Sequence, residues 1–324
     1  MNTSSPSSFQ DQANPSSACT PYREAAYALC AYVDPADDDV LDFDPPIVDD
    51  PHASLGVIEL GSGTGVVAAS VARAIRRAMM PGGFVIATDL PDVCPLLQRN
   101  LERSTSSDRI RLESDAVFVR PLAWGNLDHA TSIASEFGSR RLTHIVCSDL
   151  ASTLVHFDSL EYPAFTNPPC SQVYFPELLG PLLRTLIHLT SLSCVPSSGL
   201  SLKIVISYKI RSLSKETPFW SAFGLWFSFR PVLARRRVRP IESKSALPDN
   251  EPDAPWKQFG AEEDADRTFV FVAYHRPESI TWNVPETDKE LIEGVGARGT
   301  TSKKGDDTFE MILFMAMAVD NTCG

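Results

Sequence analysis

The sequence has too little positive charge for a typical nucleic-acid-binding protein. Lys and Arg together number 29 against 41 Asp and Glu, so the formal net charge at pH 7 is -12. Because contacts with phosphate need Lys and Arg, this balance argues against DNA or RNA as the substrate. An acidic chain suits a basic protein partner, although many acidic proteins have none. We expect no nucleic-acid partner.

The sequence also lacks the apolar segments and the cysteine pairs that mark membrane and zinc proteins. Residues 1–20 are rich in Ser, Asn and Pro, which predicts a disordered tail rather than a signal peptide or a membrane span. The seven cysteines form no C-x-x-C pair and fit no zinc spacing, so no metal is expected. We predict a protein of a reducing compartment, the cytoplasm or also the nucleus, with no membrane partner.

From residue 56 onward, apolar runs alternate with helical patterns. The runs that predict strands are 56–60, 84–89, 116–124, 143–149, 202–208, 226–233 and 267–275. Such alternation is typical of a parallel sheet covered on both faces. No clear helix separates the last two runs, which indicates an antiparallel hairpin at one edge. The sequence therefore predicts an α/β fold with a seven-stranded, mostly parallel sheet.

Residues 21–320 are expected to form a single domain after the tail at 1–20, beginning with a short amphipathic helix over 21–33. The segment 241–266 holds eight Asp or Glu against two Lys, which predicts a solvated acidic loop; steering of a basic substrate is the alternative. Trp220, Phe223 and Trp226 have a helical spacing that favours core packing over a cation–π wall. The apolar run 307–319 is expected to pack back on the core.

The strongest functional signal is the segment 59–65, Glu-Leu-Gly-Ser-Gly-Thr-Gly, which follows the first predicted strand of the sheet. Glycines permit positive φ and let a ligand approach the backbone, and the next helix begins with free N–H groups. Val66 stands where a dinucleotide-binding fingerprint needs its third glycine. The pattern resembles motif I of class I methyltransferases. A plain turn is the alternative, disfavoured because three glycines in five residues are costly.

Two further residues end the strands that follow this loop. Asp89 closes the second predicted strand, where an acidic side chain in doubly wound nucleotide sites accepts hydrogen bonds from ribose hydroxyls. Capping of the next helix is its alternative role. Trp124 closes the third predicted strand, where its indole is expected to lie against an adenine ring. Packing in the core is the alternative for this side chain.

Longer segments carry a resemblance to a known family. The strings VIELGSGTGVV (57–67), ATDLPDVCPLLQRNL (87–101) and PLAWGN (121–126) look like methyltransferase family 16, in particular the methyltransferase-like protein 21 group of protein-lysine methyltransferases. Segments 206–227 and 305–317 resemble C-terminal parts of fungal members, so the resemblance covers roughly residues 55–320. It implies a Rossmann-like class I fold, S-adenosyl-L-methionine as the cofactor, and methylation of a lysine in a protein substrate of the translation-factor or chaperone type. We expect a monomer.

The resemblance implies a role for ten residues. The cofactor-binding candidates are Glu59, Gly61, Ser62, Gly63, Gly65, Asp89, Trp124 and Ser148. The catalytic candidates are Asp149 and Tyr174, which match the ends of the family's D-x-x-Y motif beside the methyl donor. They are expected to hold the target amine through hydrogen bonds, and neither is assigned as a general base.

The D-x-x-Y motif is interrupted in this chain. Residues 151–172 separate Asp149 and Leu150 from Val173 and Tyr174, and their removal restores Ser-Asp-Leu-Val-Tyr-Phe-Pro-Glu. The piece carries three prolines and no helical or strand period, so we interpret it as a non-family insertion, from a retained intron or a gene-model artefact. A genuine surface insertion is the alternative. If translated, it is expected to displace Tyr174 or cover the pocket, and so to impair activity.

A second departure lies before the first predicted helix. Family members usually carry a Trp there, near the cofactor, whereas this chain has Tyr22 or Arg23. Other functions therefore stay open: an inactive interaction protein with the methyltransferase fold, or a methyltransferase acting on RNA or a small molecule. The sequence has no N-P-P-Y or D-P-P-Y string, since Asn167-Pro168-Pro169 is followed by Cys170. The missing third glycine argues against a nicotinamide dehydrogenase.

Overall fold

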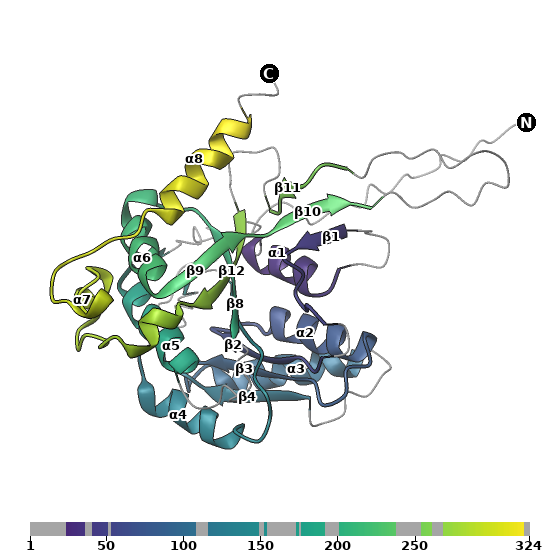
Figure 1. Ribbon diagram of the computed structural model, residues 1–324. Coiled ribbons are helices and arrows are strands. Elements are labelled where there is room, and N and C mark those ends of the chain that lie inside the picture. The colour runs from purple at the N-terminus through teal and green to yellow at the C-terminus, as the bar shows by residue number, and fades with distance from the viewer. Residues whose placement is uncertain are drawn as a thin grey trace, which may run out of the picture.

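A computed structural model gives the fold of the chain (Figure 1). It describes residues 24–35, 41–50, 53–107, 116–148, 152–153, 173–174, 176–191, 201–237, 254–260 and 268–320. None of the helices within these ranges is long and apolar enough to cross a membrane.

A seven-stranded sheet forms the centre of the molecule. Its strands in spatial order are β4 (Val117–Pro121), β3 (Phe84–Asp89), β2 (Gly56–Leu60), β5 (His144–Ser148), β8 (Lys203–Lys209), β12 (Thr268–His275) and β9 (Phe227–Pro231). Neighbouring strands are parallel except at β12, which is antiparallel to both β8 and β9. The predicted mostly parallel sheet with an antiparallel edge is confirmed. The strand order reverses between β2 and β5, and open α/β sheets bind ligands at the C-terminal ends of strands beside such a switch point.

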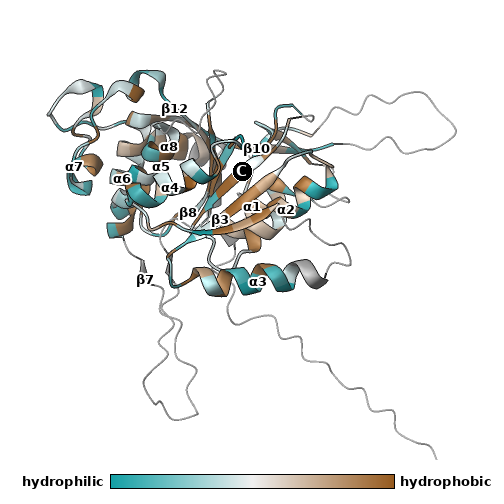
Figure 2. Ribbon diagram, turned by 90° about the horizontal axis from the view of Figure 1, so that it is seen from below, coloured by the Kyte–Doolittle hydropathy of each residue, from teal (hydrophilic) through white to brown (hydrophobic). Residues whose placement is uncertain are grey.

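Helices cover both faces of the sheet (Figure 1). One face carries α1 (Glu24–Val33), α2 (Val66–Arg77) and α3 (Cys94–Ser107). The other carries α4 (Leu127–Glu136), α5 (Leu179–Ser191) and α6 (Leu213–Trp226), with η1 (Pro176–Leu178) leading into α5. The central strands are buried on both faces, so they are continuous apolar runs, brown between the helix layers in Figure 2.

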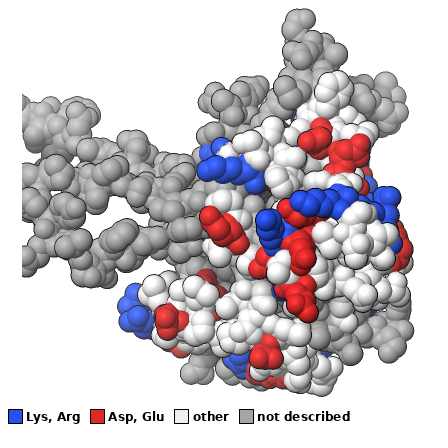
Figure 3. All heavy atoms as spheres, turned by 90° about the vertical axis from the view of Figure 1, so that its left-hand side faces the viewer, with Lys and Arg blue, Asp and Glu red and all other residues white. Residues whose placement is uncertain are grey.

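The C-terminal segments pack against α5 and α6. They are η2 (Pro277–Thr281), α7 (Asp288–Ile292), η3 (Ala297–Gly299) and α8 (Thr308–Asp320). Phe309 of α8 stacks on Trp220 with the ring centroids 5.0 Å apart, and Ile312 and Leu313 are buried with it, so the predicted packing of the run 307–319 on the core is seen for these three residues, whereas Phe314 is exposed. Trp220, Phe223 and Trp226 are fully buried, which confirms core packing for this aromatic set. On the face that carries α7, acidic and basic side chains are interspersed (Figure 3).

A second, three-stranded sheet was not predicted. It consists of β1 (Leu41–Asp44), β10 (Leu233–Arg236) and β11 (Lys257–Gln258), all antiparallel. The single strand predicted over 226–233 is therefore wrong at its end, because the chain leaves β12 after Pro231 and pairs with β1 from Leu233 onward. Proline has no N–H to donate, which suits the end of an edge strand. β11 lies inside the predicted acidic loop, whose residues 241–253 and 261–266 lie outside the described ranges.

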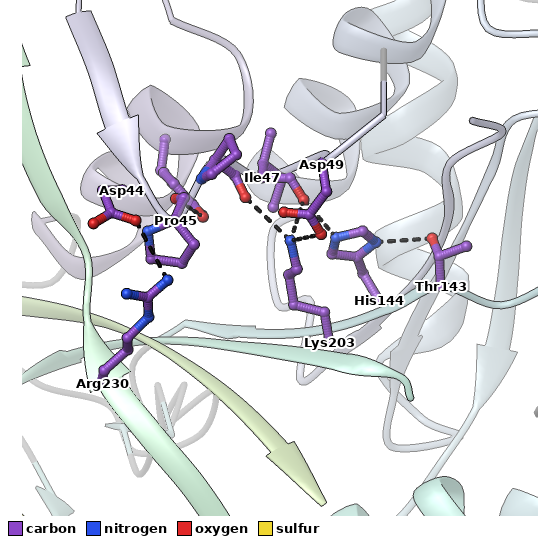
Figure 4. A network of polar contacts seen from close by, with 10 residues as sticks. Asp44, Pro45, Ile47, Asp49, Thr143, His144, Lys203 and Arg230 are labelled. Carbon is purple, nitrogen blue, oxygen red and sulfur yellow. Dashed lines mark hydrogen bonds and ion pairs between the residues drawn. The ribbon is translucent and has the colours of Figure 1, made fainter. Parts of the chain in front are cut away.

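A polar network ties the segment after β1 to the N-terminal ends of two central strands (Figure 4). Lys203, at the start of β8, donates from Nζ to the carbonyls of Pro46 and Ile47, both at 3.1 Å, and to Asp49 Oδ2 at 2.8 Å. His144, at the start of β5, holds the Ile47 carbonyl through Nε2 at 2.7 Å. Burial lowers the pKa of His144 to about 4, so the ring is neutral at pH 7. The segment is thus fixed at the sheet edge away from the glycine loop.

Two short strands belong to neither sheet. β6 (Ser152–Thr153) pairs antiparallel with β7 (Val173–Tyr174). The predicted tail at 1–20 lies outside the described residues, as do Tyr22 and Arg23, whereas the helix predicted over 21–33 is found as α1.

Candidate functional site

The glycine loop joins β2 to α2 at the C-terminal edge of the sheet. Gly61, Gly63 and Gly65 all have positive φ, at 70°, 53° and 84°. A Cβ at Gly61 would lie 3.1 Å from Cζ2 of Trp124, whereas a Cβ at Gly63 would meet nothing within 4 Å. The loop is therefore closed against Trp124 on one side and open at Gly63. An open, glycine-lined backbone at the start of a helix suits a ligand that approaches closely.

Asp89, the last residue of β3, reaches back to this loop. Its Oδ2 accepts a hydrogen bond from the Gly63 amide at 2.7 Å, and its Oδ1 accepts one from the Leu90 amide at 2.7 Å. Because α3 begins only at Cys94, the carboxylate binds the glycine loop instead of capping that helix. Each carboxylate oxygen can accept a further bond, so Asp89 retains the capacity that a ribose needs.

Trp124 lies beside the loop, in the turn after β4; the strand predicted over 116–124 is wrong at its end, because β4 ends at Pro121. The side chain is partly buried and packs against the main core cluster, while its ring edge contacts Gly61. Packing against the core is therefore seen for Trp124, and its contact with an adenine ring stays a prediction. Leu90 and Leu127, which the sequence reasoning did not select, follow the ends of β3 and β4 and are 49% and 48% exposed. The sequence signal that could have selected Leu90 is its position directly after Asp89, the acidic residue that ends the strand.

Glu59 lies under the loop and is 1% exposed. Burial raises the pKa of its carboxyl to about 7, and the negative charge of Asp89 adds to the effect. The Ser62 hydroxyl interacts with the Glu59 carboxyl and opposes this rise, but Oε2 of Glu59 and the buried hydroxyls of Ser62 and Ser207 have no hydrogen-bond partner of good geometry among the described residues. Ser207 lies on β8 in register with Ser148 and gave no sequence signal, because it stands within an apolar run.

These three orphaned polar groups test the fit of the expected cofactor. Buried polar groups without partners are rare in proteins, and a bound ligand or water normally satisfies them. The amino-acid portion of S-adenosylmethionine carries an ammonium and a carboxylate, which can bond a carboxylate and hydroxyls of this kind. Gly63 leaves open space for the ribose, and the carboxylate of Asp89 can accept hydrogen bonds from the ribose hydroxyls. The residues present therefore fit the cofactor.

The candidate catalytic residues are only partly described. Ser148 ends β5, partly buried, and Asp149 lies outside the described residues. Tyr174 pairs with Ser152, which stands at the fourth position counted from Asp149, where the D-x-x-Y motif has its tyrosine. Paired strands lie about 5 Å apart, so the pairing of β6 with β7 places the backbone of Tyr174 about 5 Å from that of Ser152. Because Asp149 lies outside the described residues, the expected displacement of Tyr174 from Asp149 by the insertion stays a prediction.

A cavity of about 400 Å³ lies elsewhere, beyond the end of β12. It is lined by Gly224, Leu225, Arg276, Glu278, Trp282, Arg298 and Asp306. Because β12 runs antiparallel to β8 and Tyr274 is in register with Lys203, this cavity is at the opposite edge of the sheet from the glycine loop. It takes no part in the site described above.

Part of the chain matches a known protein family. Residues 7–161, just under half of the chain, match the model of a family described as lysine methyltransferase, methyltransferase family 16. The match ends inside the segment 151–172. It supports the expected cofactor, S-adenosylmethionine. No curated protein shows significant similarity to the chain.

Several solved structures are similar to the chain at low identity and low TM-score. They include the DszA carbon methyltransferase (14% identity, TM-score 0.35, 71% of this chain and 49% of that one). They also include a demethyl-riboflavin dimethyltransferase from Streptomyces davawensis (12%, 0.33, 70% and 51%) and an arsenic(III) S-adenosylmethionine methyltransferase from Chlamydomonas reinhardtii (13%, 0.32, 70% and 65%). The chain thus spans about half to two thirds of the length of these proteins.

The sheet order, the glycine loop and the family match lead to one assignment. The chain has a Rossmann-like α/β fold with a seven-stranded, mostly parallel sheet, and its residues 7–161 match the family described as lysine methyltransferase, methyltransferase family 16.

Proposed function

We propose that this protein is an S-adenosylmethionine-dependent methyltransferase that methylates a lysine side chain of a protein substrate. The observation that carries the proposal is the juxtaposition of the open glycine loop with Asp89, whose carboxylate binds the Gly63 amide. The family match to residues 7–161 supports the lysine acceptor. By the family resemblance, the substrate is of the translation-factor or chaperone type, and the enzyme acts as a monomer.

The cofactor side of the reaction rests on residues from three strand ends. Asp89 would hold the ribose hydroxyls, Trp124 and Leu90 would flank the adenine, and Glu59 with Ser62 would meet the amino-acid portion. S-adenosylmethionine supplies a methyl group already activated by a sulfonium. The protein therefore contributes mainly the position of the acceptor relative to that group.

The acceptor side requires a neutral amine. A lysine in water has a pKa near 10.4, and an ammonium has no lone pair with which to attack. Entry into an apolar pocket lowers that pKa, because burial disfavours the charged form. Asp149 and Tyr174 are proposed to orient the amine through hydrogen bonds at the C-terminal end of β5.

The cofactor site is tested by calorimetric titration with S-adenosylhomocysteine. Asp89→Ala should weaken binding roughly 10- to 100-fold, because a hydrogen bond to a charged group contributes about 1.5–3 kcal/mol. Asp92→Ala is the matched control, since this exposed carboxylate lies three residues further along the same segment. It should bind like the unchanged chain. If every variant is folded and none binds, the glycine loop is not a cofactor site.

The acceptor is tested by transfer of a tritiated methyl group to the proteins of a cell extract. We expect labelled protein bands whose label resides in methyl-lysine after hydrolysis. The same assay on a chain lacking residues 151–172 tests the sequence-based expectation that the insertion impairs activity, and equal turnover of both chains would contradict it. Label found in RNA or in small molecules instead of protein would refute the lysine acceptor.

A further inference from the structure

A buried carboxylate lies near the start of α6. Glu216 is 1% exposed, and its oxygens accept a hydrogen bond from the Tyr208 hydroxyl and bonds from the backbone amides of Arg211 (3.4 Å) and Ser212 (3.2 Å). Burying a carboxylate is costly unless donors surround it, and these three donors offset that cost. None of them belongs to the cofactor-binding set.

The three donors define the conformation of the loop that joins β8 to α6. Ser212 is the N-cap residue of α6, yet its own hydroxyl makes no capping bond. Glu216 instead reaches back to the amides before and at the cap, as the acidic residue of a capping box does. The Tyr208 ring is itself held edge-on to Trp220, with centroids 5.1 Å apart, so the anchor rests on the rigid aromatic core.

This loop stands at the acceptor side of the proposed site. β8 is the direct neighbour of β5, and Ser207 lies in register with Ser148, the last residue of β5. The loop therefore rises beside the point where β5 continues into Asp149. Just after the loop, Leu213 is 47% exposed, although a large apolar side chain is normally buried.

From this geometry we infer that Glu216 is a positioning residue, which holds the loop 210–212, together with Leu213 at the start of α6, as the acceptor-side wall of the methyl-transfer site. The inference rests on the proposed function. The wall offers an apolar contact at Leu213 to the polypeptide that carries the target lysine. Loss of the anchor would misplace this wall without touching the cofactor loop, and misplacement by about 1 Å can cost roughly 100-fold in rate.

The test compares Glu216→Gln and Tyr208→Phe with the unchanged chain. Each variant is titrated with S-adenosylhomocysteine and assayed for tritiated methyl transfer to extract proteins over a range of extract concentrations. Glu290→Gln is the matched control, because Glu290 also accepts a hydrogen bond near a helix start, from Thr287 at 2.8 Å, but in α7. Hydrogen exchange of the Arg211 and Ser212 amides reports directly on the anchor.

We expect Glu216→Gln to bind S-adenosylhomocysteine within about twofold of the unchanged chain and to label extract proteins roughly tenfold more slowly at low extract concentration. Tyr208→Phe should shift both readouts in the same direction by less, and Glu290→Gln should change neither. Labelling at the unchanged rate, or cofactor binding lost in proportion to labelling, would overturn the inference. An unchanged chain that binds S-adenosylhomocysteine but labels no protein would instead refute the proposed function.

Discussion

Gly63 offers a sharp test of where the cofactor lies. Its φ is 53°, and an added Cβ would meet no protein atom within 4 Å, so Gly63→Ala fills open space above the loop. Gly299 has the same properties, with φ 67° and nothing within 4 Å of a Cβ, but it lies in η3, far along the chain. The two substitutions are thus matched in backbone strain and local space.

The stability effects of the two substitutions should be alike. An alanine in the left-handed region costs roughly 1–2 kcal/mol, of which about 0.4–1 kcal/mol is offset by the stiffer unfolded chain. Both variants should therefore lose about 1 kcal/mol in urea unfolding. Only Gly63→Ala should lose affinity for S-adenosylhomocysteine, by tenfold or more in calorimetry, which corresponds to about 1.4 kcal/mol. Equal affinity of the two variants would show that the ligand does not occupy the space above Gly63.

Further predictions concern two buried groups with shifted pKa values, Glu59 and His144, and the hydrogen bonds of Lys203. The pKa of Glu59 is raised from 4.5 to about 7, so its contribution to stability is complete below pH 4.5 and is lost as the pH rises through 7; Glu59→Gln should remove this decline from thermal melts. The pKa of His144 is lowered from 6.5 to about 4, so its contribution is complete above pH 6.5 and is lost as the pH falls through 4; melts of His144→Gln should lack that acid loss. Lys203→Met removes three hydrogen bonds, although the Ile47 carbonyl keeps its bond to His144, and should lower the free energy of unfolding by about 2–4 kcal/mol in urea, with S-adenosylhomocysteine affinity unchanged. An affinity change there would mean that the two sheet edges are coupled.

The central sheet could be predicted because its signals are local. Strands buried on both faces must be apolar along their whole length, so runs such as 84–89 and 202–208 stand out from the helices between them. The small sheet could not be predicted, because β1, β10 and β11 have only two to four residues each and are half exposed. Their pairing depends on residues far apart in the sequence, and no local pattern encodes it.

The candidate site divides in the same way. Gly61, Gly63 and Asp89 belong to short-range motifs whose spacing carries the chemistry, and the structure brings them together. The orphaned hydroxyl of Ser207 and the anchor at Glu216 were missed, because burial and partners decide their importance. A serine or a glutamate in the sequence does not show whether it is buried.

The network around Lys203 has a consequence for synthesis of the chain on the ribosome. Lys203 bonds the Pro46 carbonyl across 157 residues, and Arg235 of β10 bonds Asp42 of β1 across 193. The segment that follows α1 therefore cannot form these contacts until the chain has been synthesised as far as Arg235. Contacts of such long range slow folding and prolong the exposure of unpaired strands, so the nascent protein is expected to depend on chaperones until β10 is complete.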